Sequence, residues 1–175
     1  MGIFDGMGSA NSRGNGTANG EWFQPGTYYV SVERHVQKRE LQRGNFEGEA
    51  AVIVETRVEE VLAQGVTHDG QPTAANPADS KATAMYILQR KRTGELTKFG
   101  EMNMERLKGH FEVCLDSANT GLEVTEDVLE KLFAEGEEVL AGTPLYVEVV
   151  QALSKPKDGS PGKPFNKIYW KRASA

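Results

Sequence analysis

The chain has 175 residues, enough for one domain, with or without an extension, to bury a core without cross-links. Its net charge of −5 and pI of about 5.3 exclude a uniformly basic nucleic-acid-binding protein. Cys114 is the only cysteine, which excludes an intrachain disulfide, and we expect an intracellular protein with neither a membrane span nor a secretory signal.

Residues 1–21 form a segment of biased composition, rich in Gly, Asn and Ser from Gly6 onwards. Such a composition cannot bury enough surface to offset the entropy lost on ordering. We interpret it as an N-terminal arm. It is either a flexible tail or a segment that docks on a neighbouring subunit through Ile3 and Phe4.

The folded domain is predicted to cover residues 22–175, and alternating hydrophobicity predicts three strands in its first half. In the first strand Tyr28, Val30 and Val32 share one face. A basic hairpin loop is expected at 34–45. The second strand is expected at 46–62 with a bend near 48–51, because it exceeds the usual strand length. After an irregular loop, the third strand is expected at 82–89.

An acidic section follows the third strand: residues 101–138 hold eleven acidic and three basic side chains. Apolar residues recur there at helical spacing from Met104 to Leu115 and from Val128 to Phe133. Thr125 is the predicted N-cap of the second helix. Strands four and five are expected at 144–152 and 165–172, joined by a loop rich in Lys, Pro and Gly.

This order of elements predicts a mainly β protein, with about five antiparallel strands in an OB-fold-like barrel. An α-helical insert at about 98–138 separates strands three and four. The alternative architecture is an α+β meander sandwich.

We expect no catalytic residues, no metal site and no cofactor. His35, His68 and His110 fall in different predicted elements without metal-binding spacing, and we interpret them as solvated. Cys114 lies among apolar helix residues, as is typical of a buried, inert thiol. No glycine motif for phosphate binding follows a predicted strand.

Three basic clusters, at residues 33–43, 86–100 and 154–172, lie at predicted loops or strand ends. Together with nearby aromatic residues they favour a nucleic-acid-binding groove, in which cations meet phosphates and rings stack on unpaired bases. Residues 154–172 carry six basic side chains against one acid. Because the first and last hairpin loops flank the ligand face of an OB barrel, the first and last clusters should line one groove. Alternatively, the rings belong to the core and the lysines only solubilise hairpins. The predicted nucleic-acid-binding residues are Arg34, Lys38, Arg39, Arg90, Lys91, Arg92, Lys163, Phe165, Lys167, Tyr169, Lys171, Tyr29 and Tyr86.

Several segments carry a resemblance to a known family. They are the opening Met-Gly-Ile-Phe-Asp-Gly, the entry Phe-Gln-Pro-Gly-Thr-Tyr-Tyr-Val, the long second strand and the closing Gly-Lys-Pro-Phe-Asn-Lys-Ile-Tyr-Trp. Over roughly residues 22–63 and 140–172 the chain resembles the small OB-fold single-stranded-DNA-binding proteins of tailed bacteriophages. The resemblance implies a protein of the host cytoplasm that protects or presents single strands during phage replication or recombination. It does not include the acidic C-terminal tail of many such proteins, because this sequence ends Lys-Arg-Ala-Ser-Ala.

A second function stays open, that of a structural protein of the virion, such as a capsid-decorating or tail component. In that case the arm would contact the same chain or other phage proteins, and the acidic helices would face solvent. The expected partner is therefore either single-stranded nucleic acid or a neighbouring subunit.

Overall fold

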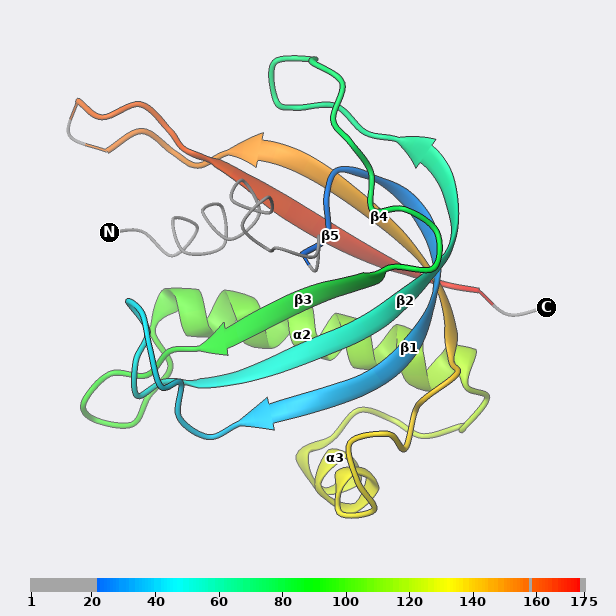
Figure 1. Ribbon diagram of the computed structural model, residues 1–175. Coiled ribbons are helices and arrows are strands. Elements are labelled where there is room, and N and C mark those ends of the chain that lie inside the picture. Colours follow the sequence, from blue (N-terminus) through cyan, green and yellow to red (C-terminus); the bar gives the residue numbers. More distant parts are fainter. Residues whose placement is uncertain (1–21, 158, 174–175) are drawn as a thin grey trace.

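The computed structural model describes residues 22–157 and 159–173 (Figure 1). The predicted arm at 1–21 lies outside the described residues. Five antiparallel strands form one sheet: β1 (Gly26–Lys38), β2 (Ala50–Gln64), β3 (Lys81–Leu88), β4 (Pro144–Leu153) and β5 (Pro164–Arg172). Helices α2 (Lys98–Ser117) and α3 (Glu126–Phe133) lie between β3 and β4 in the chain. The predicted mainly β class and helical insert are confirmed.

The strands lie in the order β3-β2-β1-β4-β5. After the helical insert, β4 returns to pair with β1, which is a Greek-key arrangement. The sheet is not closed, because β3 and β5 are its two edges. The order is consistent with an OB-like barrel that is open between its third and fifth strands.

Contacts other than a β-ladder join the two edge strands, and we call this region the seam. The backbone N–H of Phe23 donates to the carbonyl of Thr83 on β3 at 3.2 Å. From β5, the Asn166 side chain donates to the carbonyl of Phe23 at 3.0 Å. Inside the core, Trp170 Nε1 on β5 donates to the hydroxyl of Tyr86 on β3 at 2.6 Å. The segment before β1 therefore holds the two edges together.

Helix α2 passes behind the sheet and contacts both edge strands (Figure 1). Near its start Asn103 Nδ2 donates to the carbonyl of Ile87 on β3 at 2.8 Å. At its end Asp116 forms an ion pair of 3.1 Å with Arg172 on β5. The helix thus covers the side on which the sheet is open.

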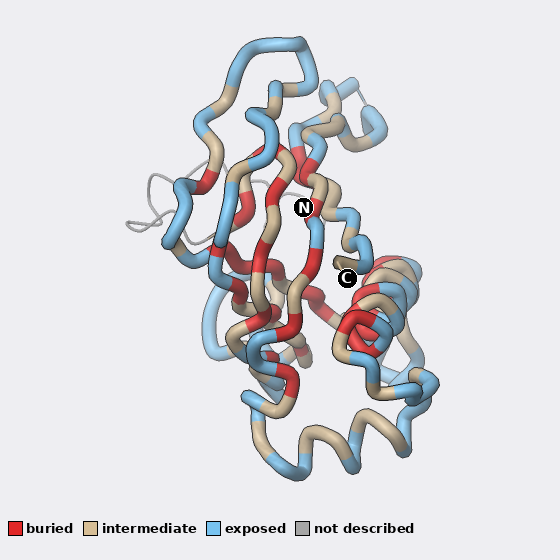
Figure 2. The backbone as a smooth tube through the Cα atoms, turned by 90° about the vertical axis from the view of Figure 1, so that its right-hand side faces the viewer, coloured by how far each residue is buried: buried red, intermediate tan, exposed pale blue. Residues whose placement is uncertain are grey.

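The core lies between α2 and the inner face of the sheet. Figure 2 shows buried and less buried positions alternating along the strands. Tyr28, Val30 and Val32 are buried together, as predicted. The predicted N-cap of α3 is also confirmed, since the hydroxyl of Thr125 accepts a hydrogen bond from Val128 N–H at 3.1 Å. No helix in the described part of the chain is long and apolar enough to cross a bilayer.

The connection from β1 to β2 differs from the prediction. A loop was expected from Arg34, but β1 continues to Lys38. The register against β2 shifts between Val32 and Arg34, and this bulge inverts the alternation so that His35 points into the core. Because the bulge interrupts the period-two alternation, these polar residues do not show the pattern of a strand and were predicted to be a loop.

Candidate nucleic-acid interface

Three tyrosines lie on the outer face of the sheet, away from α2. Tyr29 on β1 is paired with Tyr146 on β4, and their ring centroids are 5.4 Å apart. Tyr169 on β5 is paired with Glu148, two residues along β4 from Tyr146, so the two rings are diagonal neighbours. The side chains of Tyr146 and Tyr169 are 41% and 47% exposed. Such rings are open to a flat ligand.

Two lysines accompany these rings on β5. Lys167 and Lys171 lie two positions before and after Tyr169, so all three belong to the same face of the strand. Lys171 Nζ lies 3.9 Å from a Glu148 carboxylate oxygen, but an exposed pair of this kind is weak and exchanges readily for another anion. We call the set formed by Tyr29, Tyr146, Tyr169, Lys167 and Lys171 the tyrosine face.

Two of the predicted stacking residues are buried, so the prediction that they offer exposed rings is wrong. Phe165 is 6% and Tyr86 is 4% exposed. Burial raises the pKa of Tyr86 to about 12, and its hydroxyl faces Trp170 in the core. Both faces of β3 are covered, one by the main core and one by a smaller cluster, and its sequence therefore shows no alternation that would have revealed this.

Arg34 carries a charge that is already paired. Its guanidinium donates to both carboxylate oxygens of Glu55 on β2, from Nη2 at 3.3 Å and from Nε. This hydrogen bond raises the pKa of Arg34 further. A phosphate bound by Arg34, as predicted, would have to compete with Glu55 for its guanidinium.

The other predicted cations lie outside the tyrosine face. The turn after β3 adjoins the β1–β2 loop, because Arg90 N–H donates to a carboxylate oxygen of Glu49 at 3.0 Å. Both extend towards the lower left of Figure 1, while the β4–β5 loop that carries Lys163 extends towards the upper left. The first two basic clusters therefore adjoin each other, and only the third leads into the strand that bears Tyr169. The predicted binding residues of the first two clusters, apart from Arg34, are Lys38, Arg39, Arg90, Lys91 and Arg92.

The outer side of β2 and β3, which binds ligands in OB barrels, is partly covered here. Ala51, Ile87 and Phe99 form a small buried cluster. Phe46 from the β1–β2 loop stacks on Phe99, with ring centroids 5.6 Å apart. The exposed tyrosines described above therefore lie on a different part of the sheet, formed by β1, β4 and β5.

Sequence reasoning missed Tyr146. It alternates with Leu145 and Val147, which are both fully buried. The same alternation that assigned those two residues to the core would have placed Tyr146 on the outer face. The signal was present in the sequence.

The expectation that the histidines are solvated is wrong for two of them. His35 and His110 are 0% and 1% exposed, and their Nε2 atoms lie 2.8 Å apart across 75 residues of sequence. Burial lowers the pKa of His35 to about 4, and burial and the neighbouring His35 lower that of His110 well below its usual value. His68 is exposed, as expected. No local spacing could have predicted a contact between β1 and α2.

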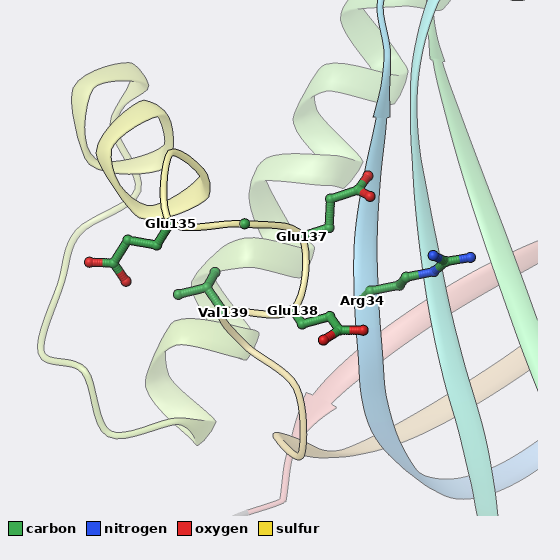
Figure 3. A pocket seen from close by; sticks show the side chains of 6 residues that line it. Arg34, Glu135, Glu137, Glu138 and Val139 are labelled. Atoms are coloured by element: carbon green, nitrogen blue, oxygen red, sulfur yellow. The ribbon is translucent and has the colours of Figure 1, made fainter.

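A cavity of about 460 Å³ lies beside β1, where the chain leaves α3 (Figure 3). Glu135, Glu137, Glu138 and Arg34 supply its charged side chains. In Figure 3 the Arg34 side chain reaches across towards β2, where its Glu55 partner lies. The cavity is therefore acidic and unsuited to a polyanion.

Comparisons of the chain with protein-family models, with curated proteins and with solved structures find no match.

Proposed function

We propose that this chain binds single-stranded nucleic acid on the tyrosine face. The observation that supports it is the alignment of Tyr29, Tyr146 and Tyr169 across three neighbouring strands, with Lys167 and Lys171 beside them. A role in phage replication or recombination, as the resemblance implies, is part of this proposal.

Exposed rings favour single strands over a duplex, because a ring can stack only on a base whose face is free. Each stacked base contributes on the order of 1–3 kcal/mol. Two or three stacked bases, with a few counterions released by the lysines, would give binding in the micromolar range or tighter. The net charge of −5 argues against phosphate contacts as the only source of affinity, so the rings have to supply much of it.

The first test is a titration of fluorescently labelled oligo-dT with the protein at low salt, followed by anisotropy. Tyr146→Ala and Tyr169→Ala should each raise Kd roughly 5- to 150-fold. Tyr146→Phe and Tyr169→Phe should bind nearly as well as the wild type, because they keep the ring. Leu122→Ala is the matched control, since this residue is 46% exposed and lies in the connection between the helices.

The lysines should act through salt dependence. Lys167→Ala and Lys171→Ala are each expected to reduce the slope of log Kd against log salt by about 0.7, the value for one contact with a single-stranded phosphate. Lys131→Ala on α3 should leave the slope unchanged, and so should Arg34→Ala, whose charge is paired with Glu55. Equal salt slopes for Lys167→Ala and the control Lys131→Ala would show that Lys167 does not contact a phosphate, and the same comparison applies to Lys171→Ala.

Absence of an anisotropy change at micromolar protein and low salt contradicts the proposal as a whole. Unchanged binding by both Tyr→Ala variants would move the interface elsewhere on the molecule. The virion role depended on the arm at 1–21, which is outside the described residues, and nothing in the described part favours it. Mass spectrometry of purified particles would detect the chain if it were a virion component.

A further inference from the structure

A cluster of potential metal ligands lies in the core and is separate from the tyrosine face. His35 comes from β1, while His110 and Cys114 lie one turn apart on the buried side of α2. One ring nitrogen of each imidazole and the Sγ of Cys114 lie within 4.8 Å of one another. All three side chains are at most 1% exposed.

Burying these two imidazoles costs folding free energy, and the packing of the core does not require polar side chains here. Their Nε2 atoms are 2.8 Å apart, so one ring donates and the other accepts. The Nδ1 atom of each ring is buried without a hydrogen-bond partner, although buried polar atoms are almost always paired. Apolar side chains would fill the same space without orphaned nitrogens. What two imidazoles and a thiol share is the ability to coordinate a soft or borderline metal ion.

We propose that His35, His110 and Cys114 bind one Cu(I) ion. With bond lengths like those at zinc sites, about 2.0 Å to nitrogen and about 2.3 Å to sulfur, the donors of a planar three-coordinate ion lie about 3.5 Å apart. The two Nε2 atoms, now at 2.8 Å, would have to separate by less than an ångström. Rotation of the imidazole rings about their side-chain bonds is enough for this.

Charge balance favours a monovalent ion at this position. On binding, the Cys114 thiol releases its proton to solvent and becomes a thiolate. The ring that carried its proton on Nε2 changes to the Nδ1–H tautomer, so that both Nε2 lone pairs face the metal. One positive charge enters and one leaves, and the buried site keeps its net charge.

Zn²⁺ would leave an additional positive charge in this core and would need a fourth ligand, because structural zinc sites are tetrahedral. The surroundings are aromatic instead. The ring centroids of Phe111 and Phe133 lie 5.1 and 5.4 Å from that of His35, and the Trp170 ring lies 4.4 Å from His110. These rings exclude water, which protects a Cu(I) thiolate from oxidation.

The acidic cavity lies beside the strand that carries His35. It is lined by Glu135, Glu137 and Glu138, and its wall includes Arg34, the residue next to His35. The backbone N–H of His35 donates to the carbonyl of Glu137 at 3.0 Å, so the backbone of the cavity lining is joined to that of the proposed ligand. Carboxylates at the mouth of the cavity raise the local concentration of cations.

The test is an anaerobic competition between the reduced full chain and a chromophoric Cu(I) chelator. The wild type should withdraw one equivalent of Cu(I) and gain a thiolate-to-copper charge-transfer band in the near ultraviolet. Cys114→Ser should weaken binding by roughly a hundredfold or more and lose the band. His68→Gln is the matched control, since this histidine is exposed and outside the cluster. Far-ultraviolet circular dichroism of each variant verifies that it is folded.

X-ray absorption on the copper-loaded wild type tests the proposal without any substitution. One sulfur and two nitrogens in the first shell are the expected result. Uptake no greater than that of Cys114→Ser, or a first shell without sulfur, overturns the site. Tighter binding of Zn²⁺ than of Cu(I) by the same three residues overturns the choice of ion.

Discussion

Replacing Phe23 by Ala is expected to lower the free energy of unfolding by about 3–5 kcal/mol. The side chain is 0% exposed, and its ring packs against those of Tyr28 and Trp170 at centroid distances of 5.8 and 5.7 Å. Because Phe23 lies in the seam, the cavity left by the truncation would also loosen the link between β3 and β5. Urea unfolding followed by circular dichroism measures the change.

Phe46→Ala is the matched control for this prediction. It removes the same atoms, but from a partly buried ring in the smaller cluster beside the β1–β2 loop. We expect Phe46→Ala to lower the free energy of unfolding by less than half as much as Phe23→Ala. The slope of that free energy against urea concentration should be the same for both variants. If the two variants lose equal stability, the contribution of Phe23 does not come from linking β3 and β5.

Acidification from pH 6.5 to about 4.5 should destabilise the metal-free protein, and His35 and His110 are the reason. The imidazole of His35 titrates near 6.5 in the unfolded chain and at about 4 in the folded protein. Between these two pH values the unfolded chain binds more protons than the folded protein does. The free energy of unfolding is therefore highest above pH 6.5 and decreases as the pH falls towards 4. The shift of His35 corresponds to about 3 kcal/mol once the pH has fallen to about 4. His110, whose pKa is also lowered, adds to the loss.

Urea unfolding of the protein at a series of pH values, with a chelator present, tests this. The double variant His35→Leu/His110→Leu should show a much flatter profile between pH 6.5 and 4.5. His68→Gln should keep the wild-type profile, because this ring is exposed. A wild-type stability that is equal at pH 7 and pH 4.5 contradicts the prediction.

The sequence was sufficient for the elements and their order, because both periodicities are strong. Alternation of apolar residues located β4 to within one residue of its observed end, and the cap at Thr125 located the start of α3. The helical spacing of apolar residues between the third and fourth strands was enough to predict the helices inserted there. These features depend on neighbours in the chain, which a sequence displays.

Features that depend on distant residues could not be read in this way. A bulge after Val32 turned His35 inwards, and a contact across 75 residues joined it to His110. Tyr86 is buried because it faces the main core, where its hydroxyl accepts a hydrogen bond from Trp170, 84 residues away in the sequence. Arg34 was taken as a cation for phosphate, whereas the strand pairing places Glu55 opposite to it. Register, more than propensity, decided which candidate residues are open to a ligand.

The seam has a consequence for how the chain is made. The hydrogen bond from Asn166 to Phe23 spans 143 residues, so the ribosome has to deliver the chain beyond residue 166 before this junction can form. Until then both sheet edges have unsatisfied backbone groups, which attract other nascent chains. Co-translational folding of this protein should therefore end when β5 docks on the segment that precedes β1, and truncation before residue 166 should yield aggregates.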